Sequence, residues 1–139
     1  MGWPLRVLAA CLGVFLIAMA ADKFPWIVDG GPLLERFQRS AMTARPEVRW
    51  YLETIAIPAS PLFARLVPLG ELATGIALVA GLWPRLAAAV ALFMVLNFHF
   101  ATGSYWSSGF LRDGAGLPVI GGLVALVLNR ARLPWTITS

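Results

Sequence analysis

Hydrophobic residues gather into four long runs, which are separated by short polar turns and one long mixed connection. The runs cover about residues 3–21, 61–83, 86–103 and 109–129. About 20 residues of helix cross the ~30 Å hydrocarbon layer of a bilayer, and a spanning segment must satisfy its own backbone hydrogen bonds. The pattern therefore predicts an all-α, integral membrane four-helix bundle that forms a single domain over residues 1–139.

The long connection, residues 22–60, predicts an amphipathic helical insertion between the first two spans, because an unstructured loop of that length is unusual. Arg49 and Glu53 can pair at i,i+4 on the polar side of this insertion. The insertion either covers the helix ends or offers residues 33–57 as a docking surface for a partner. Two apolar stripes recur in it at helical spacing: Leu34, Phe37 and Ala41, and then Val48, Tyr51, Leu52 and Ile55.

The short turn at residues 82–85 makes the second and third spans antiparallel neighbours, so four spans place both termini on the side of this turn. The basic residues on that side have no accompanying acid, and they are Arg6, Arg85, Arg130 and Arg132. The opposite side has seven basic and six acidic residues, and the basic count alone favours that side as cytoplasmic. Several of those seven lie inside the amphipathic helices, however, and we expect cytoplasmic termini.

The first run also has features of a signal peptide, with a cleavage site at residues 18–20. Cleavage there would leave three spans and would strand Asp22 and Lys23 at the new terminus. We therefore expect an uncleaved first helix.

Composition supports a membrane protein whose surroundings are the lipid bilayer. Apolar residues make up 59% and charged residues 13% of the chain, with a mean hydropathy of +0.76, whereas soluble domains have about 25% charged residues. A soluble protein of this composition would expose large apolar patches. The sequence pI near 10.2 comes from basic residues scattered at the ends of apolar runs, which favours membrane anchoring and excludes nucleic acid as a partner.

Glu71 is the most informative polar residue, because it lies near the middle of the second span without a charged neighbour in sequence. An ionisable group at that depth costs about 2.5 kcal/mol or more unless it is paired, neutralised or hydrated. Glu71 is therefore either a functional acid or a hydrogen-bonded group that holds helices together.

Asn97 and His99 reach the same membrane level as Glu71. Counted from Arg85 at 1.5 Å per residue, all three lie about 18 to 21 Å from the turn. Because Asn97 and His99 are separated by about 200° around a helix, we expect one of them to face another helix. His99 is either a satisfied structural group or a hydrogen-bond donor or acceptor for a metal or a quinone.

Further polar and aromatic residues are predicted to lie at the same membrane side, beneath the amphipathic connection. We expect a polar cluster there in which Lys23 or Arg112 compensates Glu71 or Asp113. The residues that arrive at this side are Asp22, Lys23, Trp26, Tyr105, Trp106, Arg112 and Asp113.

Several catalytic motifs are missing from the sequence. It contains no P-loop, GxGxxG, HExxH, nucleophile elbow or pair of axial histidines, and its single cysteine, Cys11, excludes an internal disulfide and a thiolate-rich zinc site. The chain is therefore not expected to be a self-sufficient redox enzyme, and we predict no intrinsic cofactor and no metal site.

The segment from Glu71 to Ala88, ELATGIALVAGLWPRLAA, resembles the E-x3-G-x5-G-L-x2-R-x-A-A segment of the DoxX family of small bacterial membrane proteins. Lys23 at the end of the first helix and His99 near the end of the third also fit that family. The resemblance covers both ends of the first span and residues 66–129, whereas the connection 29–57 is enlarged relative to a compact member.

The resemblance implies a four-helix protein of the bacterial cytoplasmic membrane. Its type was first associated with thiosulfate:quinone oxidoreductase, whose subunits deliver electrons to the quinone pool. Quinone is then the candidate cofactor, and other membrane or peripheral subunits are the candidate partners. Such a chain would be at most one subunit of a quinone-linked oxidoreductase.

Our leading hypothesis is a DoxX-like membrane subunit of a larger assembly linked to redox or quinone metabolism. Glu71 and His99 are its candidate catalytic residues. One alternative is a non-catalytic structural or assembly subunit that docks a partner through residues 33–57, and another is a small proton-linked transporter that uses Glu71. The candidate substrate-binding residues are Lys23, Asn97, Tyr105, Trp106, Arg112 and Asp113.

Overall fold

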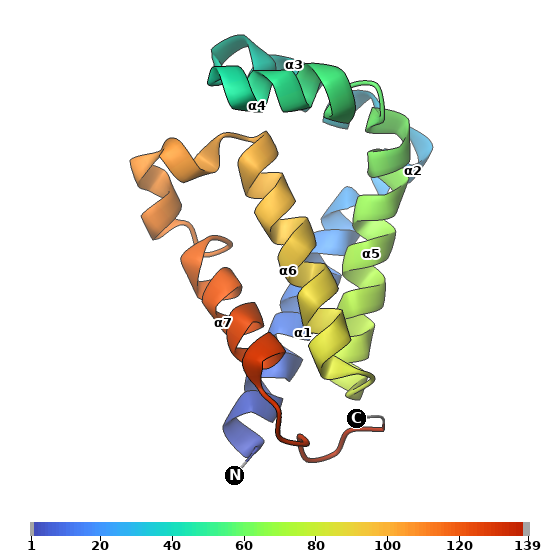
Figure 1. The fold of residues 1–139 in the computed structure, drawn as a ribbon. Helices are drawn as coiled ribbons and strands as arrows, with labels where there is room; N and C mark the ends of the chain where they lie inside the picture. The colour runs from blue at the N-terminus through green and yellow to red at the C-terminus, as the bar shows by residue number, and fades with distance from the viewer. Residues whose placement is uncertain (1, 138–139) are drawn as a thin grey trace.

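A computed structural model describes residues 2–137, and in this part of the chain all regular structure is helical. Four of the helices, α1, α5, α6 and α7, run alongside one another, and α3 and α4 lie across one end of this group (Figure 1). The elements in order are α1 (Trp3–Lys23), α2 (Pro25–Val28), α3 (Gly31–Thr43), α4 (Pro46–Tyr51), η1 (Leu52–Ala56), α5 (Ser60–Ala80), α6 (Pro84–Ala101), η2 (Ser104–Trp106), η3 (Ser108–Arg112) and α7 (Leu117–Leu128).

Three helices, α1, α5 and α6, are long and apolar enough to cross a membrane, and α7 is a shorter apolar helix. The starts and ends of α1, α5 and α6 lie within three residues of the first three spans predicted from the sequence. Large apolar side chains point outward along them, which is the reverse of a soluble protein and fits a lipid surrounding. The exposed ones on these three helices include Val7, Val14, Leu62, Leu66, Leu69, Ile76, Leu86, Val90 and Phe93.

The fourth apolar run is not the single helix over residues 109–129 that the sequence predicts. The backbone breaks between η3 and α7, where the Asp113 carboxylate accepts a hydrogen bond from the Ala115 amide at 3.0 Å. A Cβ atom on Gly116 would lie 2.8 Å from the Phe110 carbonyl oxygen, so this close approach requires glycine. Pro118 then suits the first turn of α7.

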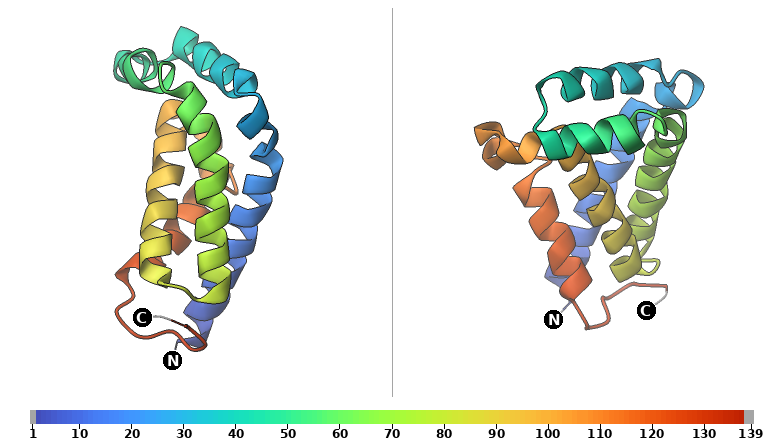
Figure 2. Two further views of the ribbon diagram at one scale, coloured as in Figure 1. Left: turned by 90° about the vertical axis from the view of Figure 1, so that its right-hand side faces the viewer. Right: turned by 45° about the horizontal axis from the view of Figure 1, so that its top comes forward.

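The insertion between α1 and α5 forms a cover over one end of the molecule, made of α3, α4 and η1 (Figure 2). Its inner face packs on α5 and α6. The first stripe is centred on Leu33 rather than the predicted Leu34, and the second ends at Ala56, while Ile55 is exposed. The buried apolar residues of this layer are Leu33, Phe37, Ala41, Val48, Leu52, Ala56, Ala64 and Ala101.

The shift in the second stripe has a backbone cause. Residues Leu52–Ala56 form a π-helix, in which the Ile57 amide bonds to the Leu52 carbonyl oxygen at 2.8 Å. A π turn holds one more residue than an α turn, so the buried face moves on by one position.

The predicted Arg49–Glu53 pair is also wrong. The Arg49 guanidinium instead donates to the carbonyl oxygens of Ala41 at 3.0 Å and Met42 at 3.4 Å, where it caps the C-terminal end of α3.

Helices α1 and α5 form the closest packing in the molecule. A Cβ atom on Gly13 would lie 2.7 Å from the Gly75 carbonyl oxygen, and one on Gly75 would lie 2.8 Å from the Gly13 oxygen. The two backbones therefore touch where these glycines cross, as small residues allow in membrane helices. This crossing brings the C-terminal end of α1, with Lys23, beside the middle of α5, with Glu71.

Candidate functional site

A buried ion pair between Lys23 and Glu71 lies at the centre of the candidate site. The Lys23 ammonium donates to both carboxylate oxygens of Glu71, at 2.6 and 2.7 Å. The two side chains are only 8% and 12% exposed. Of the two cations considered from the sequence, Lys23 is therefore the one that compensates Glu71. A doubly hydrogen-bonded pair of this kind is strong when it is formed and costly when one partner is lost.

The pair lies in the wall of a cavity of about 340 Å³. Apolar and aromatic side chains from α1, α3, α5 and α6 make up most of the lining. The polar residues that line the cavity are Lys23, Glu71, Asn97, His99 and Asp113. A mainly apolar cavity with a few polar groups is the usual form of a site for a small organic ligand.

His99 is buried, with 3% of its surface exposed. Its Nε2 atom lies 3.1 Å from the Ala115 carbonyl oxygen, and because a carbonyl oxygen only accepts, Nε2 is the ring nitrogen that donates. The other ring nitrogen, Nδ1, is buried and has no hydrogen-bond partner among the described residues. Buried polar atoms are rarely left unpaired, so Nδ1 is a polar atom that a bound hydrogen-bond partner would satisfy.

Asn97 contacts the cover rather than the ion pair. The Tyr51 hydroxyl donates to its Oδ1 atom at 2.7 Å. Asn97 and His99 thus bond to different elements, one to α4 and the other to the chain before α7, as their angular separation on α6 requires.

The remaining predicted residues take different positions. Asp113 lines the cavity and Trp26 lies in its wall, whereas Arg112, Tyr105 and Trp106 do not line it. Arg112 is exposed, and the Tyr105 hydroxyl donates to the Leu96 carbonyl oxygen at 2.9 Å. Burial raises the pKa of the Tyr105 hydroxyl above its usual value, so this group stays a donor at neutral pH.

Trp106 and Phe98 are held by cations of the cover. The Arg45 guanidinium lies 5.2 Å from the centre of the Trp106 ring. The Phe98 ring, which lines the cavity, is approached by Arg36 at 5.0 Å and by Lys23 at 5.9 Å. Cations at such distances are attracted to an aromatic face, so Arg36 holds the cover to α6 and Arg45 holds it to η2.

Two groups of this site were not foreseen from the sequence. Tyr51 was assigned only to an apolar stripe, yet its hydroxyl orients Asn97. The Ala115 carbonyl, which orients His99, leaves no signal in side-chain chemistry. Within residues 2–137 no group of three or more His, Cys, Asp or Glu side chains is arranged to hold a metal ion.

Comparison with known proteins adds one match. The family model described as DoxX matches residues 4–103, which include the Lys23–Glu71 pair, Asn97 and His99. Among curated proteins and among solved structures, nothing matches the chain.

Proposed function

The chain belongs to the DoxX family of small membrane proteins, and we propose that it is a membrane subunit that holds a quinone headgroup for a redox partner. The observation that carries the proposal is the cavity itself, which is mainly apolar and has an ion pair and an unpaired histidine nitrogen in its wall. An apolar volume of about 340 Å³ suits a ring and the start of an isoprenoid tail, within the range of pockets that hold small ligands.

The chemistry of His99 favours the reduced form of such a ligand. When Nε2 donates to the Ala115 carbonyl oxygen, the Nδ1 atom of the neutral ring is an acceptor. A quinol offers a hydroxyl donor, whereas a quinone offers only carbonyl acceptors. The Lys23–Glu71 pair can in turn donate to a quinone carbonyl through Lys23 and accept a proton through Glu71.

Electrons must come from a partner subunit. Reduction of a quinone consumes two electrons and two protons, and the chain has no redox motif of its own. In our proposal the chain binds and orients the ring, and Glu71 relays a proton. The partner supplies the electrons.

The cavity and its lining also support a proposal for how the helices lie in the membrane. We propose that α1, α5, α6 and α7 all insert into the bacterial cytoplasmic membrane as a four-helix bundle. Irregular backbone is tolerated at membrane depth where it lines a cavity, and residues 113 and 115 do line it. The short α7 and the unwound segment before it would then complete the fourth crossing.

Ligand binding tests the proposal directly. Gently purified protein should retain a quinone and bind a short-chain quinol, and His99→Phe should weaken quinol binding about tenfold, the loss of one or two kcal/mol for a buried hydrogen bond. Glu71→Gln should slow quinone-dependent turnover of the assembly. Gln38→Ala, on the exposed face of the cover, is the control that leaves both unchanged. Absence of a co-purifying partner together with absence of quinol binding contradicts the proposal.

A docking function has separate support from the outer face of the cover. Met42 and Trp50 are 72% and 62% exposed there, and a large exposed aromatic is typical of an interface anchor. If docking is the whole function, Met42→Ser with Trp50→Ser releases a partner that co-purifies with the chain, and Glu71→Gln has little effect. A proton-linked transporter instead predicts a flux that Glu71→Gln abolishes.

A further inference from the structure

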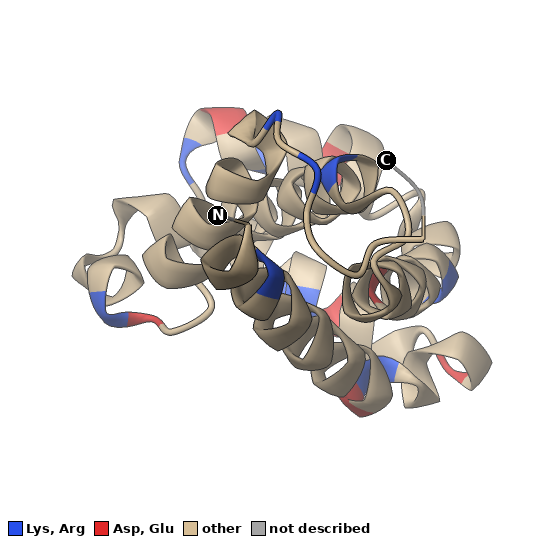
Figure 3. Ribbon diagram, turned by 90° about the horizontal axis from the view of Figure 1, so that it is seen from below, with Lys and Arg blue, Asp and Glu red and all other residues tan. Residues whose placement is uncertain are grey.

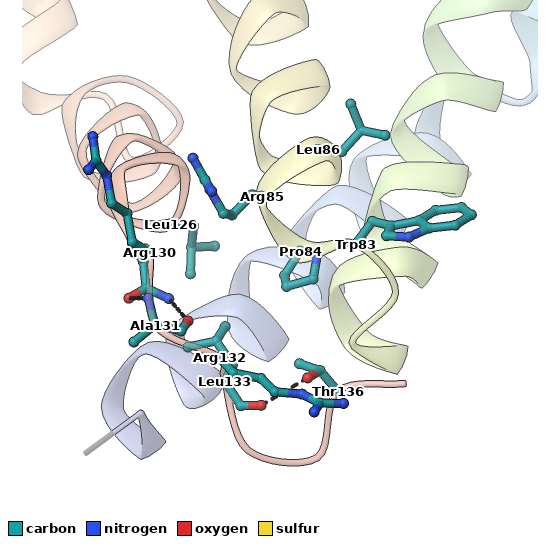
Figure 4. Close-up of a pocket in the computed structure, with 11 residues that line it drawn as sticks. Trp83, Pro84, Arg85, Leu86, Leu126, Arg130, Ala131, Arg132, Leu133 and Thr136 are labelled. Atoms are coloured by element: carbon teal, nitrogen blue, oxygen red, sulfur yellow. Dashed lines mark hydrogen bonds between the residues drawn. The ribbon is translucent and has the colours of Figure 1, made fainter. Parts of the chain in front are cut away.

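A second cavity lies at the opposite end of the molecule, where both termini are found. Its volume is about 480 Å³, and it is bounded by the start of α6, the end of α7 and the C-terminal segment (Figure 4). Three arginines line it: Arg85, Arg130 and Arg132. The proposed quinone function does not use this cavity.

The shape of the cavity is built by the C-terminal segment. Leu133 is buried against the core of the helices, and the Ile137 amide donates to the Gly81 carbonyl oxygen at 3.1 Å. Gly81 has a φ of 73°, a conformation that glycine adopts freely, and it ends α5 at this point. The segment is therefore tied to the helix ends at two places.

The arginines at this cavity have no acidic side chain beside them in the described part of the chain. The seven acidic residues of the chain all lie between positions 22 and 113, and none is at this end. In the view from below, several of the blue positions lie close to the two termini (Figure 3). Arg6 is engaged with the carbonyl oxygens of Leu78 and Val79.

The arginines of this cavity have N–H groups that donate no hydrogen bond within the described part of the chain. Arg85 uses only its Nε atom, which donates to the Val127 carbonyl oxygen at 3.2 Å. Among the described residues no acid or carbonyl group pairs with Arg130 or Arg132. Figure 4 shows the Arg85 and Arg130 side chains extending in the same direction on one side of the cavity. Arginine forks bind phosphate oxygens in pairs.

The floor of the cavity is apolar, and its rim has the residues of a membrane surface. Leu86, Leu126 and Leu133 line it. Trp3, Trp83 and Trp135 are exposed at the same end, and tryptophan is enriched at the level of lipid headgroups. A ligand that fits both parts has a phosphate group and an acyl chain.

We propose that this cavity binds the phosphodiester headgroup of an anionic phospholipid. Arg85 and Arg130 contact the phosphate from one side of the cavity, and Arg132, whose side chain lies beside Thr136, adds positive charge from the other side (Figure 4). The first carbons of an acyl chain cover the leucines. Basic pockets between membrane helices bind such lipids in other proteins.

Native mass spectrometry of the full chain, released from nanodiscs of phosphatidylglycerol and phosphatidylcholine in equal amounts, tests the proposal. The wild type should retain phosphatidylglycerol. Arg130→Gln with Arg132→Gln should weaken its retention about 30-fold, at about a factor of five for each arginine near a lipid surface. Both side chains are exposed and neither makes a hydrogen bond or ion pair among the described residues, so the variant should fold.

Two comparisons make the result specific. Arg39→Gln with Arg65→Gln removes the same charge from exposed positions near the cover and should leave lipid retention unchanged. Arg85→Lys keeps the charge and should retain the lipid better than Arg85→Gln.

Equal losses in both double variants overturn the site, because they show a response to net charge alone. Unchanged retention in Arg130→Gln with Arg132→Gln overturns it as well. Displacement of the lipid by millimolar inorganic phosphate shows a site for free phosphate, and it contradicts the lipid assignment.

Discussion

Lys23 and Glu71 neutralise one another in the wall of a mainly apolar cavity, where both side chains are largely buried. The pair differs from an exposed ion pair because both groups have left bulk solvent, and a buried charge without its partner is strongly unfavourable. Each residue therefore depends on the other as its hydrogen-bonded partner of opposite charge. A ligand that approaches the pair meets a fixed donor and a fixed acceptor rather than two flexible surface groups.

This coupling predicts a non-additive pair of substitutions. Lys23→Met should lower the free energy of unfolding by about 3 kcal/mol, because Glu71 is left buried and unpaired. Lys23→Met with Glu71→Leu should recover most of that loss, since no buried charge remains. Thermal unfolding in detergent micelles measures both, with Arg39→Met as the exposed control. A double variant less stable than Lys23→Met alone contradicts this view of the pair.

The sequence identified Glu71 as a residue that needs a partner, but it left open whether Lys23 or Arg112 is that partner. Depth along the helices follows from residue number alone, so Glu71, Asn97 and His99 could be placed at one level. The direction of each side chain depends on helix rotation and packing. That is why the choice between Lys23 and Arg112, and the contacts of Asn97 and His99, needed the structure.

At the scale of elements, the crossing of α1 and α5 positions the site. Its contact is made by glycine backbones, and the α1 and α5 surfaces on either side can then interlock. Because Lys23 and Glu71 lie beyond this crossing on different helices, a wider separation of the helices would move the ammonium away from the carboxylate.

We predict that Gly75→Ala destabilises the protein by about 1 to 3 kcal/mol, the usual cost of an overpacked contact. A Cβ atom there would lie 2.8 Å from the Gly13 carbonyl oxygen, whereas nothing lies within 4 Å of one on Gly121. Gly121→Ala in α7 is therefore the matched control, and helix propensity predicts that it is neutral or slightly stabilising. Equal unfolding temperatures for the two variants would show that the helices do not touch here.

The Tyr51 hydroxyl should help to hold the cover in place, beside its apolar and cation–π contacts. Tyr51→Phe removes the donor to Asn97 and leaves a partly buried amide oxygen unpaired, at a cost of about 1 kcal/mol. Amide hydrogen exchange in α3, α4 and η1 should become about fivefold faster. Tyr105→Phe also loses one hydrogen bond, to Leu96, but leaves exchange in the cover unchanged. Identical exchange in the Tyr51→Phe variant and the wild type contradicts the prediction.

The sequence predicted which segments are helical, because helices follow from apolar runs and helical periodicity. It did not predict where a helix is interrupted inside such a run. The π-helix at Leu52–Ala56 has no composition that distinguishes it from an α-helix. The break before α7 depends on the Asp113 side chain, which bonds to the Ala115 amide, and on a close backbone approach at Gly116. Such local contacts are decided by tertiary packing.

At the scale of the whole molecule, the length of α7 decides the topology. Its 12 residues reach about 18 Å, less than the ~30 Å of hydrocarbon. In the structure α7 nevertheless returns the chain to the end that holds the N-terminus (Figure 1). In the proposed four-helix arrangement the irregular segment before α7 supplies the rest of the crossing, and two of its residues, Asp113 and Ala115, line the cavity.

Cysteine labelling tests this topology in a Cys11→Ala background. Gln38→Cys, on the exposed face of the cover, and Ala131→Cys, after α7, are both exposed. Four crossings would place these positions on opposite sides of the membrane, and we expect the termini in the cytoplasm. A membrane-impermeant maleimide should then label Gln38→Cys in intact cells and Ala131→Cys only after the membrane is opened. Labelling of both in intact cells would mean that α7 stays on the side of the cover. The reverse pattern would keep the four crossings but invert the protein in the membrane.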